Sequence, residues 1–166
     1  QLFELYPFDA VLLGYSAMNF AYRQKGLQAA ADRNRPTVVM NPLGGGLIPQ
    51  HPDKFSFLKT TPDENIVHSA LRFLLSDDRI TVALVGFSNK DEVKDAVSAA
   101  ENFQPLSDKQ IGDMKKSLQN SFDQMCTSCQ YCDICPQGIP VPKLMDTYNH
   151  YMLFGDWQDA LDRLNY

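Results

Sequence analysis

The residues most able to do chemistry in this chain are four cysteines spaced three positions apart, Cys126, Cys129, Cys132 and Cys135, and the chain has no other cysteine. Disulfides stabilise a fold mainly by closing long loops, and cysteines this close together would close very short ones, so the spacing argues against a disulfide framework. Four neighbouring thiolates repel one another unless a cation or an iron–sulfur core neutralises them. The motif therefore predicts a metal or cluster site, with free, reducible thiols as the alternative.

The spacing favours an iron–sulfur cluster over zinc. It is close to the ferredoxin run C-x2-C-x2-C-x3-C-P, in which three thiolates hold one cubane and the fourth serves a second cluster. Here the last gap is one residue shorter and no second cysteine group exists, so Cys135 either joins the same cluster or stays free. Zinc ribbons separate two C-x2-C pairs by a longer loop, which this motif lacks. We expect a [4Fe–4S] cluster, with zinc as the alternative.

The composition excludes several classes of function. The chain has 166 residues, 44% of them hydrophobic, and a formal net charge of −5. This length and apolar content suffice for a hydrophobic core. The net negative charge and the lack of a basic stripe argue against nucleic acid as a partner. Because no apolar stretch reaches about 18 residues and no signal-like segment opens the chain, we expect a soluble, cytoplasmic protein without a membrane partner.

Three short apolar runs alternate with helical patterns. The runs cover residues 10–15, 37–40 and 81–85 and show no polar alternation, which is typical of strands buried on both faces. A helical pattern over about 22–34 separates the first two runs, and a second one separates the last two. This alternation predicts an α/β fold with a parallel sheet and right-handed crossovers.

Capping residues predict where the helices begin. Thr61 and Glu64 form a capping-box pattern ahead of the second helix, and Ser88 is the expected N-cap of a third helix that runs to about Asn102. The second helix places residues 66, 67, 70, 71, 74 and 75 on one face, the spacing of an amphipathic helix packed on a sheet.

The rest of the chain is expected to be helical around the cysteines. Ser107 and Gln110 form another capping box, ahead of a helix that reaches to about residue 122. After the cysteines, a helix introduced by two prolines should run through Leu153 and end near Gly155, with a short last helix after Asp156.

Three strands alone leave the edges of a parallel sheet exposed. We therefore expect the chain to be a segment of something longer, with the missing strands upstream of Gln1, and we expect an incomplete sheet to favour a homo-oligomer. Two parts are predicted: residues 1–106 as the α/β part, and residues 107–166 as a helical extension that carries the cysteines.

Three segments in this order resemble one family. Residues 38–47 (VVMNPLGGGL), residues 70–73 (ALRF) followed by 85–89 (VGFSN), and the cysteine segment 126–140 are similar to the carboxy-terminal half of an aldo/keto reductase of the iron–sulfur type. The resemblance covers nearly the whole chain. It implies the last three strands and helices of a (β/α)8 TIM barrel, with a helical, cysteine-rich carboxy-terminal extension.

The resemblance also implies a reaction and a cofactor. Family members reduce a carbonyl substrate, or catalyse the reverse reaction, by hydride transfer with NAD(P)H. Their Asp, Tyr, Lys and His tetrad lies on earlier strands, so no catalytic residue is assigned in this chain, and the chain assayed alone is expected to be inactive. The residues implied in cofactor binding are Asn41, Pro42, Leu43, Gly44, Gly86 and Ser88, where glycines let backbone amides approach a pyrophosphate.

One departure from the family and two further points leave alternatives open. Many NADPH-dependent members carry an arginine for the 2′-phosphate where this sequence has Glu92 or its neighbours Asp91 and Lys90, and a carboxylate repels that phosphate. NADH, or loss of cofactor binding, is therefore more plausible than a preference for NADPH. Tyr15, at the end of the first strand, offers a π-face for the cofactor or belongs to the core. The competing function is a non-catalytic zinc- or cluster-binding module that serves as an association surface.

Overall fold

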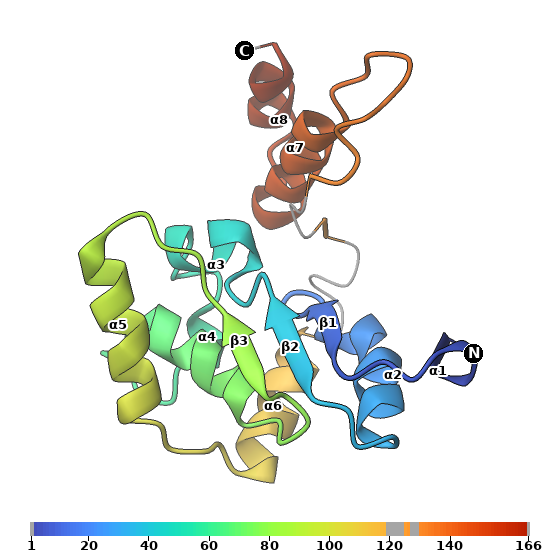
Figure 1. Ribbon diagram of the computed structural model, residues 1–166. Helices are drawn as coiled ribbons and strands as arrows, with labels where there is room; N and C mark the ends of the chain where they lie inside the picture. The colour runs from blue at the N-terminus through green and yellow to red at the C-terminus, as the bar shows by residue number, and fades with distance from the viewer. Residues whose placement is uncertain (1, 119–124, 127–129, 166) are drawn as a thin grey trace.

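The three apolar runs form one parallel sheet. β1 (Val11–Gly14), β2 (Thr37–Met40) and β3 (Val82–Leu84) pair in the order β1-β2-β3. Figure 1 shows the computed structural model, which describes residues 2–118, 125–126 and 130–165. The predicted α/β fold with a parallel sheet is confirmed.

Helices connect the strands and follow them. The connecting elements are α1 (Leu2–Leu5), α2 (Phe20–Ala31), the 3-10 turn η1 (Gly44–Gly46), α3 (Leu47–Gln50), the 3-10 turn η2 (Ser56–Leu58) and α4 (Ile66–Leu75). After β3 come α5 (Lys90–Glu101), α6 (Asp108–Leu118), α7 (Val141–Phe154) and α8 (Trp157–Leu164). The predicted helices therefore all exist, although the expected end of α6 near residue 122 lies outside the described residues.

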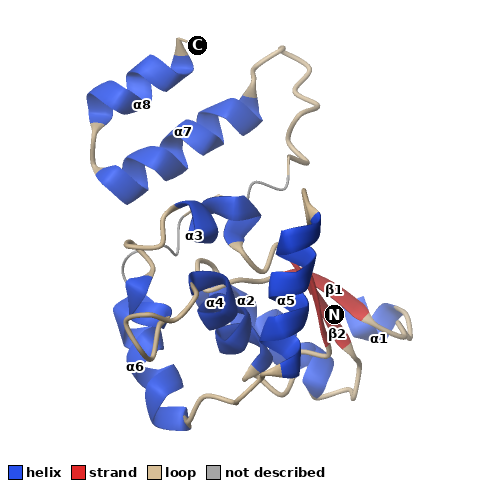
Figure 2. Ribbon diagram, turned by 90° about the vertical axis from the view of Figure 1, so that its left-hand side faces the viewer, coloured by secondary structure: helices blue, strands red, loops and turns tan. Residues whose placement is uncertain are grey.

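Helices cover one face of the sheet. In Figure 2 the strands lie at the right of the main body, and α2 and α4 both lie to their left, against the same face of the sheet. Leu13, Val39 and Ala83 lie side by side in the register and belong to the core with these helices. Their neighbours point the other way, and three of them are exposed: Leu12 by 56%, Val82 by 42% and Leu84 by 50%.

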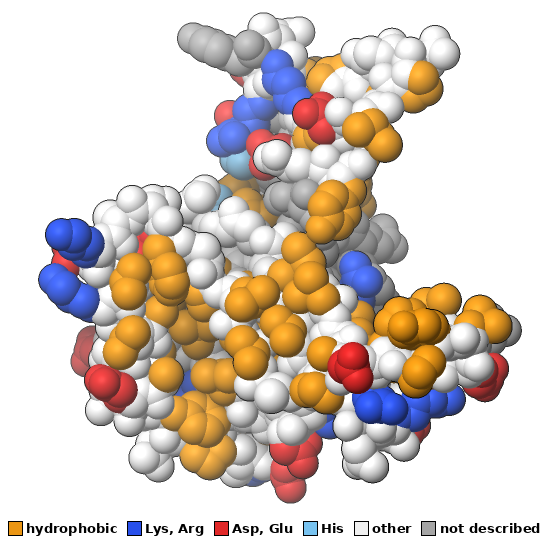
Figure 3. Space-filling view, in the orientation of Figure 1, with side chains coloured by type: hydrophobic (Ala, Val, Ile, Leu, Met, Phe, Trp, Pro, Cys, Tyr) orange, Lys and Arg blue, Asp and Glu red, His pale blue; other side chains and the backbone are white. Residues whose placement is uncertain are grey.

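The expectation that both faces of the strands are buried is therefore wrong for the described residues. In Figure 3 hydrophobic side chains gather over the strands, on the face turned toward the viewer. The reason is physical: the strands are apolar on both faces, but the helices α2 and α4 pack on the same side, and no described element covers the other.

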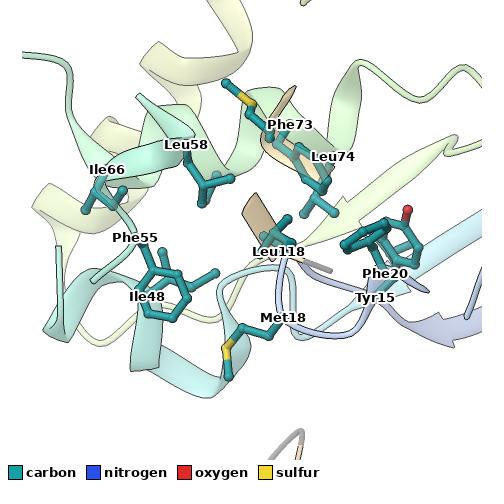
Figure 4. Close-up of a cluster of buried hydrophobic side chains, with 14 of the residues drawn as sticks. Tyr15, Met18, Phe20, Ile48, Phe55, Leu58, Ile66, Phe73, Leu74 and Leu118 are labelled. Atoms are coloured by element: carbon teal, nitrogen blue, oxygen red, sulfur yellow. The ribbon is translucent and has the colours of Figure 1, made fainter. Parts of the chain in front are cut away.

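The core lies between the sheet and its helices. Its largest side chains, shown in Figure 4, come from the segment after β1, from α3 and η2, and from α4 and α6. They are Tyr15, Met18, Phe20, Ile48, Phe55, Leu58, Ile66, Phe73, Leu74 and Leu118. Because α6 contributes Leu118 and Met114, the chain beyond residue 106 shares this core. The proposed division at residue 106 stays a prediction.

Three of the predicted helix ends have the expected geometry. Ser107 and Gln110 form the capping box: the Ser107 N–H donates to Gln110 Oε1 at 3.0 Å, and the Gln110 N–H donates to Ser107 Oγ at 3.4 Å. α7 ends at Gly155, whose φ of 70° is left-handed and whose N–H donates to the Tyr151 carbonyl. The Asp156 side chain caps α8 by accepting from the Asp159 N–H.

Two other predicted N-caps are wrong. α4 begins at Ile66, and Asn65 rather than Thr61 is its cap, because the Asn65 side chain accepts from the Val67 N–H at 2.8 Å. Asn89 rather than Ser88 caps α5, with its side-chain oxygen 3.0 Å from the N–H groups of both Asp91 and Glu92. Asparagine is a stronger N-cap than threonine and about as strong as serine, so at α5 the choice between Ser88 and Asn89 depends on local geometry.

The last two helices stand together, apart from the helices that cover the sheet (Figures 1 and 2). One aromatic side chain, Phe154 at the end of α7, joins them to the segment after α3. Its ring lies 4.8 Å from the ring of His51 and 4.4 Å from that of His150, and the Lys54 ammonium lies 5.4 Å from its centre. No described helix is long and apolar enough to span a membrane.

We predict that this contact weakens in acid. Burial lowers the pKa of His150, and the nearby Arg163 and His51 lower it further, against the opposing effect of Asp159 and Asp146. The native state therefore takes up a proton at His150 less readily than the unfolded chain does. The contribution of His150 to the free energy of unfolding is fully present above a pH of about 6.5, and it is lost as the pH falls toward the lowered pKa of the native state. Amide exchange is base-catalysed and slows in acid by itself, so the quantity to measure is the protection factor, which should fall in α7 and α8 between pH 7.5 and 5.5.

The matched variants are His150→Gln and His68→Gln. The first removes the titrating group beside Phe154 and should flatten the pH dependence of protection in α7. The second removes a histidine that pairs with Asp95 elsewhere in the fold and should leave that pH dependence as it is. Equal pH profiles for the wild-type chain and His150→Gln would contradict the assignment.

Candidate functional site

A groove opens where two neighbouring strands end. β2 and β3 run parallel, so the turns that follow them, residues 41–46 and 85–89, lie at the same end of the sheet (Figure 1). The groove has a volume of about 550 Å³. Its walls are formed by the two turns, by α3 and by the first turns of α5. The lining residues are Asn41, Pro42, Leu43, Gly45, Gly46, Pro49, Gln50, Val67, Leu84, Val85, Gly86, Phe87, Ser88, Glu92, Asp95 and Ala96.

The first wall is a turn in the left-handed region of backbone space. Asn41 has a φ of 58°, and Gly44, Gly45 and Gly46 have φ values of 63°, 67° and 95°. Asparagine and glycine are the residues that tolerate this conformation. At Gly44 a side chain is also excluded sterically, because a Cβ there would collide with the sulfur of Met18. The chain thus passes close to the core and then presents bare backbone to the groove.

The second wall is organised by a carboxylate. Glu92, in the first turn of α5, accepts from the Ser88 N–H at 2.7 Å through Oε2 and from the Asn89 side-chain amide at 2.9 Å through Oε1. The first bond satisfies the backbone N–H of the residue before the N-cap Asn89, one position earlier than in a capping box, and the second holds the Asn89 side chain. They also mean that a carboxylate already occupies the Ser88 N–H at the edge of the groove.

A second carboxylate lies one helical turn further along α5. Asp95 Oδ1 is 2.8 Å from His68 Nε2, and both of its oxygens accept from the Asn65 side-chain amide, at 3.2 and 3.1 Å. These contacts tie α5 to the start of α4. Among the described residues that line the groove, the charged ones are Glu92 and Asp95, so the groove is negative.

The structure brings together five of the six residues implied in cofactor binding. Asn41, Pro42 and Leu43 line the groove from the first turn, and Gly86 and Ser88 line it from the second. The sixth, Gly44, is buried beneath the turn against Met18. Their role in binding stays a prediction, but their grouping does not depend on it.

The sequence reasoning missed several lining residues. Pro49 and Gln50 reach the groove because α3 follows the glycine turn directly. Asp95 follows Glu92 by three positions on α5, so the helical spacing was a usable signal for it. Val67 lies on the apolar face of α4, which suggested core. Phe87 lies between Gly86 and Ser88, in the segment 85–89 that the resemblance implied in cofactor binding, although it was not itself assigned.

Tyr15 belongs to the core. It is 1% exposed, and its hydroxyl accepts from the Gln24 side chain at 2.8 Å. Burial, together with the nearby Asp77 carboxylate, raises the pKa of Tyr15 well above its ordinary value. The phenol therefore stays protonated at neutral pH, and it does not line the groove.

The cysteine segment is described in part. Cys126, Cys132 and Cys135 are free and half-buried. Cys129 lies outside the described residues. Gln130, ahead of Cys132, has a φ of 61°. Gly138, after Cys135, has a φ of 67° and donates its N–H to the Cys135 carbonyl at 3.0 Å.

Within the described part of the chain, no three His, Cys, Asp or Glu side chains are grouped closely enough to hold a metal ion. His51 and His150 do come together, although they are far apart in sequence, because both rings pack against Phe154, that of His51 edge-on. The cluster on the four cysteines stays a prediction.

Comparisons with known proteins address the fold around the groove. No curated protein matches the sequence. Solved structures do: the holo form of aldo-keto reductase AKR11C1 from Bacillus halodurans superposes with a TM-score of 0.55 at 20% identity, over 64% of this chain and 42% of that one. Its apo form gives a TM-score of 0.56 at 20% identity, over 66% of this chain and 43% of that one.

At this identity the structural similarity shows the fold alone, and this chain spans less than half the length of those structures. The fold is that of part of an aldo/keto reductase barrel. The family assignment itself rests on the sequence: the model of the Aldo/keto reductase family matches residues 3–119, which include both turns of the groove. The chain belongs to the aldo/keto reductase family.

Proposed function

We propose that the groove binds the nicotinamide dinucleotide of an aldo/keto reductase, and that the whole protein reduces a small carbonyl substrate, or catalyses the reverse reaction. The observation that carries this proposal is the convergence of two turns at the carboxyl ends of neighbouring parallel strands. Parallel barrels build their sites from such turns. The cofactor, when bound, supplies the hydride; the residues of this chain hold it.

The groove fits an extended ligand. Its volume of about 550 Å³ falls within the range of small-molecule sites, roughly 300 to 1,000 Å³. At Gly86 a Cβ would meet nothing within 4 Å, so the glycine is not required by packing within this chain. The open space above it is where a bound cofactor would lie. Left-handed glycines on the facing turn leave the backbone bare along the other wall.

The charge of the groove favours a cofactor without a 2′-phosphate. Glu92 already accepts from the Ser88 N–H, and Asp95 adds a second carboxylate nearby. In the family, the position of Glu92 and its neighbours often carries an arginine for the 2′-phosphate. A carboxylate there repels an additional phosphate. We therefore propose NADH rather than NADPH as the preferred cofactor.

The open face of the sheet supports a larger assembly. Leu12, Val82 and Leu84 are large apolar side chains in one exposed layer, and such a layer is unfavourable in water. The solved aldo-keto reductase extends well beyond the part that aligns with this chain. We propose that further strands, which carry the catalytic tetrad, cover this face in the whole protein. The chain by itself is then expected to bind cofactor but not to reduce carbonyls.

The proposal for the extension is a [4Fe–4S] cluster on Cys126, Cys129, Cys132 and Cys135. The donor set fits: thiolates are the ligands that such clusters use, and the three described cysteines are free and accessible. The loop also leaves apolar side chains exposed to solvent, Tyr131 by 74% and Ile134 by 85%. These side chains could pack over a bound cluster. A structural zinc ion is the competing occupant.

We predict that Gly86→Val weakens NADH binding by about tenfold, which corresponds to about 1.4 kcal/mol. The added side chain enters open groove and displaces no atom of the chain, so the urea midpoint should hardly change. Gly112→Val in α6 is the matched control, because a Cβ there also meets nothing within 4 Å and lies away from the groove. NADH fluorescence titration measures both. Equal affinities in the two variants would contradict the site.

We predict that Glu92→Gln shifts the preference toward NADPH by about fivefold to tenfold, as expected for removing one charge close to a phosphate. Glutamine keeps an oxygen that can accept from the Ser88 N–H, so the start of α5 should remain capped. Asp91→Asn is the control, since it removes the same charge from the same helical turn but does not line the groove. A comparable shift in Asp91→Asn would assign the effect to net charge rather than to the groove.

The cluster is tested by iron and acid-labile sulfide analysis of anaerobically purified chain, together with its visible absorption. We expect stoichiometric iron and sulfide and a visible band that dithionite bleaches, all lost when Cys126 and Cys129 are both replaced by serine. Stoichiometric zinc without sulfide, in a colourless protein that chelators unfold, would replace the cluster by the structural zinc module.

A further inference from the structure

A single buried amide holds the first cysteine. The Cys126 N–H donates to Asn149 Oδ1 at 2.8 Å, and Asn149 Nδ2 donates to the Cys126 carbonyl at 2.7 Å. Asn149 lies on α7 and is 0% exposed. Its side chain thus pairs with both the N–H and the carbonyl of Cys126, as a residue of a neighbouring β-strand would.

This pairing closes a loop at its base. The chain leaves the core at Met125, which is 4% exposed, and passes at once into Cys126. It then runs through the other cysteines and returns as α7, where Asn149, 23 positions after Cys126, reaches back to the point of departure. The cysteine segment is therefore anchored at both ends before any ligand is bound, by the core on one side and by α7 on the other.

We propose that Asn149 is a positioning residue that holds the backbone of Cys126, one ligand of the cluster. This inference rests on the proposed cluster. With both backbone groups of Cys126 held, its Cα–Cβ bond points in one direction, so before loading its sulfur is restricted to the staggered rotamers about that bond. Closing the base in advance also removes part of the loop entropy that assembly would otherwise lose.

The chemistry of the side chain explains why asparagine stands here. Asparagine carries a donor and an acceptor at a fixed separation on a short stem. Aspartate retains the acceptor for the Cys126 N–H, but it loses the donor, faces the Cys126 carbonyl with an oxygen, and adds a charge near the thiolates. Leucine has the same branching as asparagine but a larger volume, and it retains neither bond, so it leaves two part-buried backbone groups without partners.

The experiment compares Asn149→Leu, Asn149→Asp and His150→Gln with the wild-type chain. His150 is the next residue on α7 and contacts Phe154 and α8 instead of the cysteine segment, so its variant is the matched control for a loosened tail. The first readout is the exchange rate of the Cys126 amide in apo protein. The second is the rate at which reconstituted cluster is lost to a chelator, followed by its visible absorption and its reduction potential.

We expect faster exchange at Cys126 and cluster loss about 10- to 100-fold faster in Asn149→Leu, the usual effect of removing a residue that supports a metal ligand. Asn149→Asp should lie between Asn149→Leu and the wild type, and keeps the test valid if Asn149→Leu does not fold. His150→Gln should leave cluster loss and potential as in the wild type. Any larger effect of His150→Gln would show that a stable tail, rather than Asn149, is what matters.

Two failures are distinguishable. If exchange at Cys126 rises in Asn149→Leu while cluster loss and potential stay at their wild-type values, Asn149 is structural and this inference is wrong, but the cluster stands. If the wild-type chain takes up no iron or sulfide, the proposed cluster is wrong and this inference with it, although the amide exchange still reports the hydrogen bonds of Asn149.

Discussion

The parallel register of the three strands is the constraint from which the rest of the structure follows. It places Leu13, Val39 and Ala83 in one row that packs against the helices, and so sets where the core lies. The same register makes β2 and β3 end at one edge, so the turns after them must meet. The groove is thus a consequence of strand pairing. So is the open layer of Leu12, Val82 and Leu84, because alternate side chains of a strand point to opposite faces.

Glu92 serves the fold and the groove in ways that pull in different directions. Its carboxylate accepts from the Ser88 N–H and the Asn89 amide, which stabilises the start of α5, and a negative charge at a helix amino terminus is favourable in itself. For the groove, the same charge occupies a backbone donor and repels phosphate. A residue free to serve the ligand alone would be neutral or positive. The stability of α5 and the proposed cofactor selectivity of the groove therefore depend on one side chain. A substitution that removes the charge of Glu92 but keeps its hydrogen bonds distinguishes these two roles.

Much of the architecture could be predicted because it depends on local patterns. The three strands, the capping box of Ser107 and the end of α7 at Gly155 follow from apolar runs, from the spacing of a serine and a glutamine, and from the left-handed preference of glycine. The predicted N-cap of α5 was wrong by one residue, because Ser88 and Asn89 are both good caps and the choice between them depends on side-chain geometry. The bond between Asn149 and Cys126 had no local signal at all, since it joins residues 23 positions apart.

Helix α7 is what connects the cysteine segment to the groove. Near its middle, Asn149 binds the backbone of Cys126, and at its end Phe154 packs on His51, which directly follows Gln50 at the wall of the groove. An α-helix transmits position along its length because its hydrogen bonds run within the segment. The two anchors differ in kind: the amide is buried and makes two hydrogen bonds, whereas the aromatic contact depends on the rings of two histidines packed against Phe154. We therefore expect the contact at Phe154 to open before the bonds between Asn149 and Cys126.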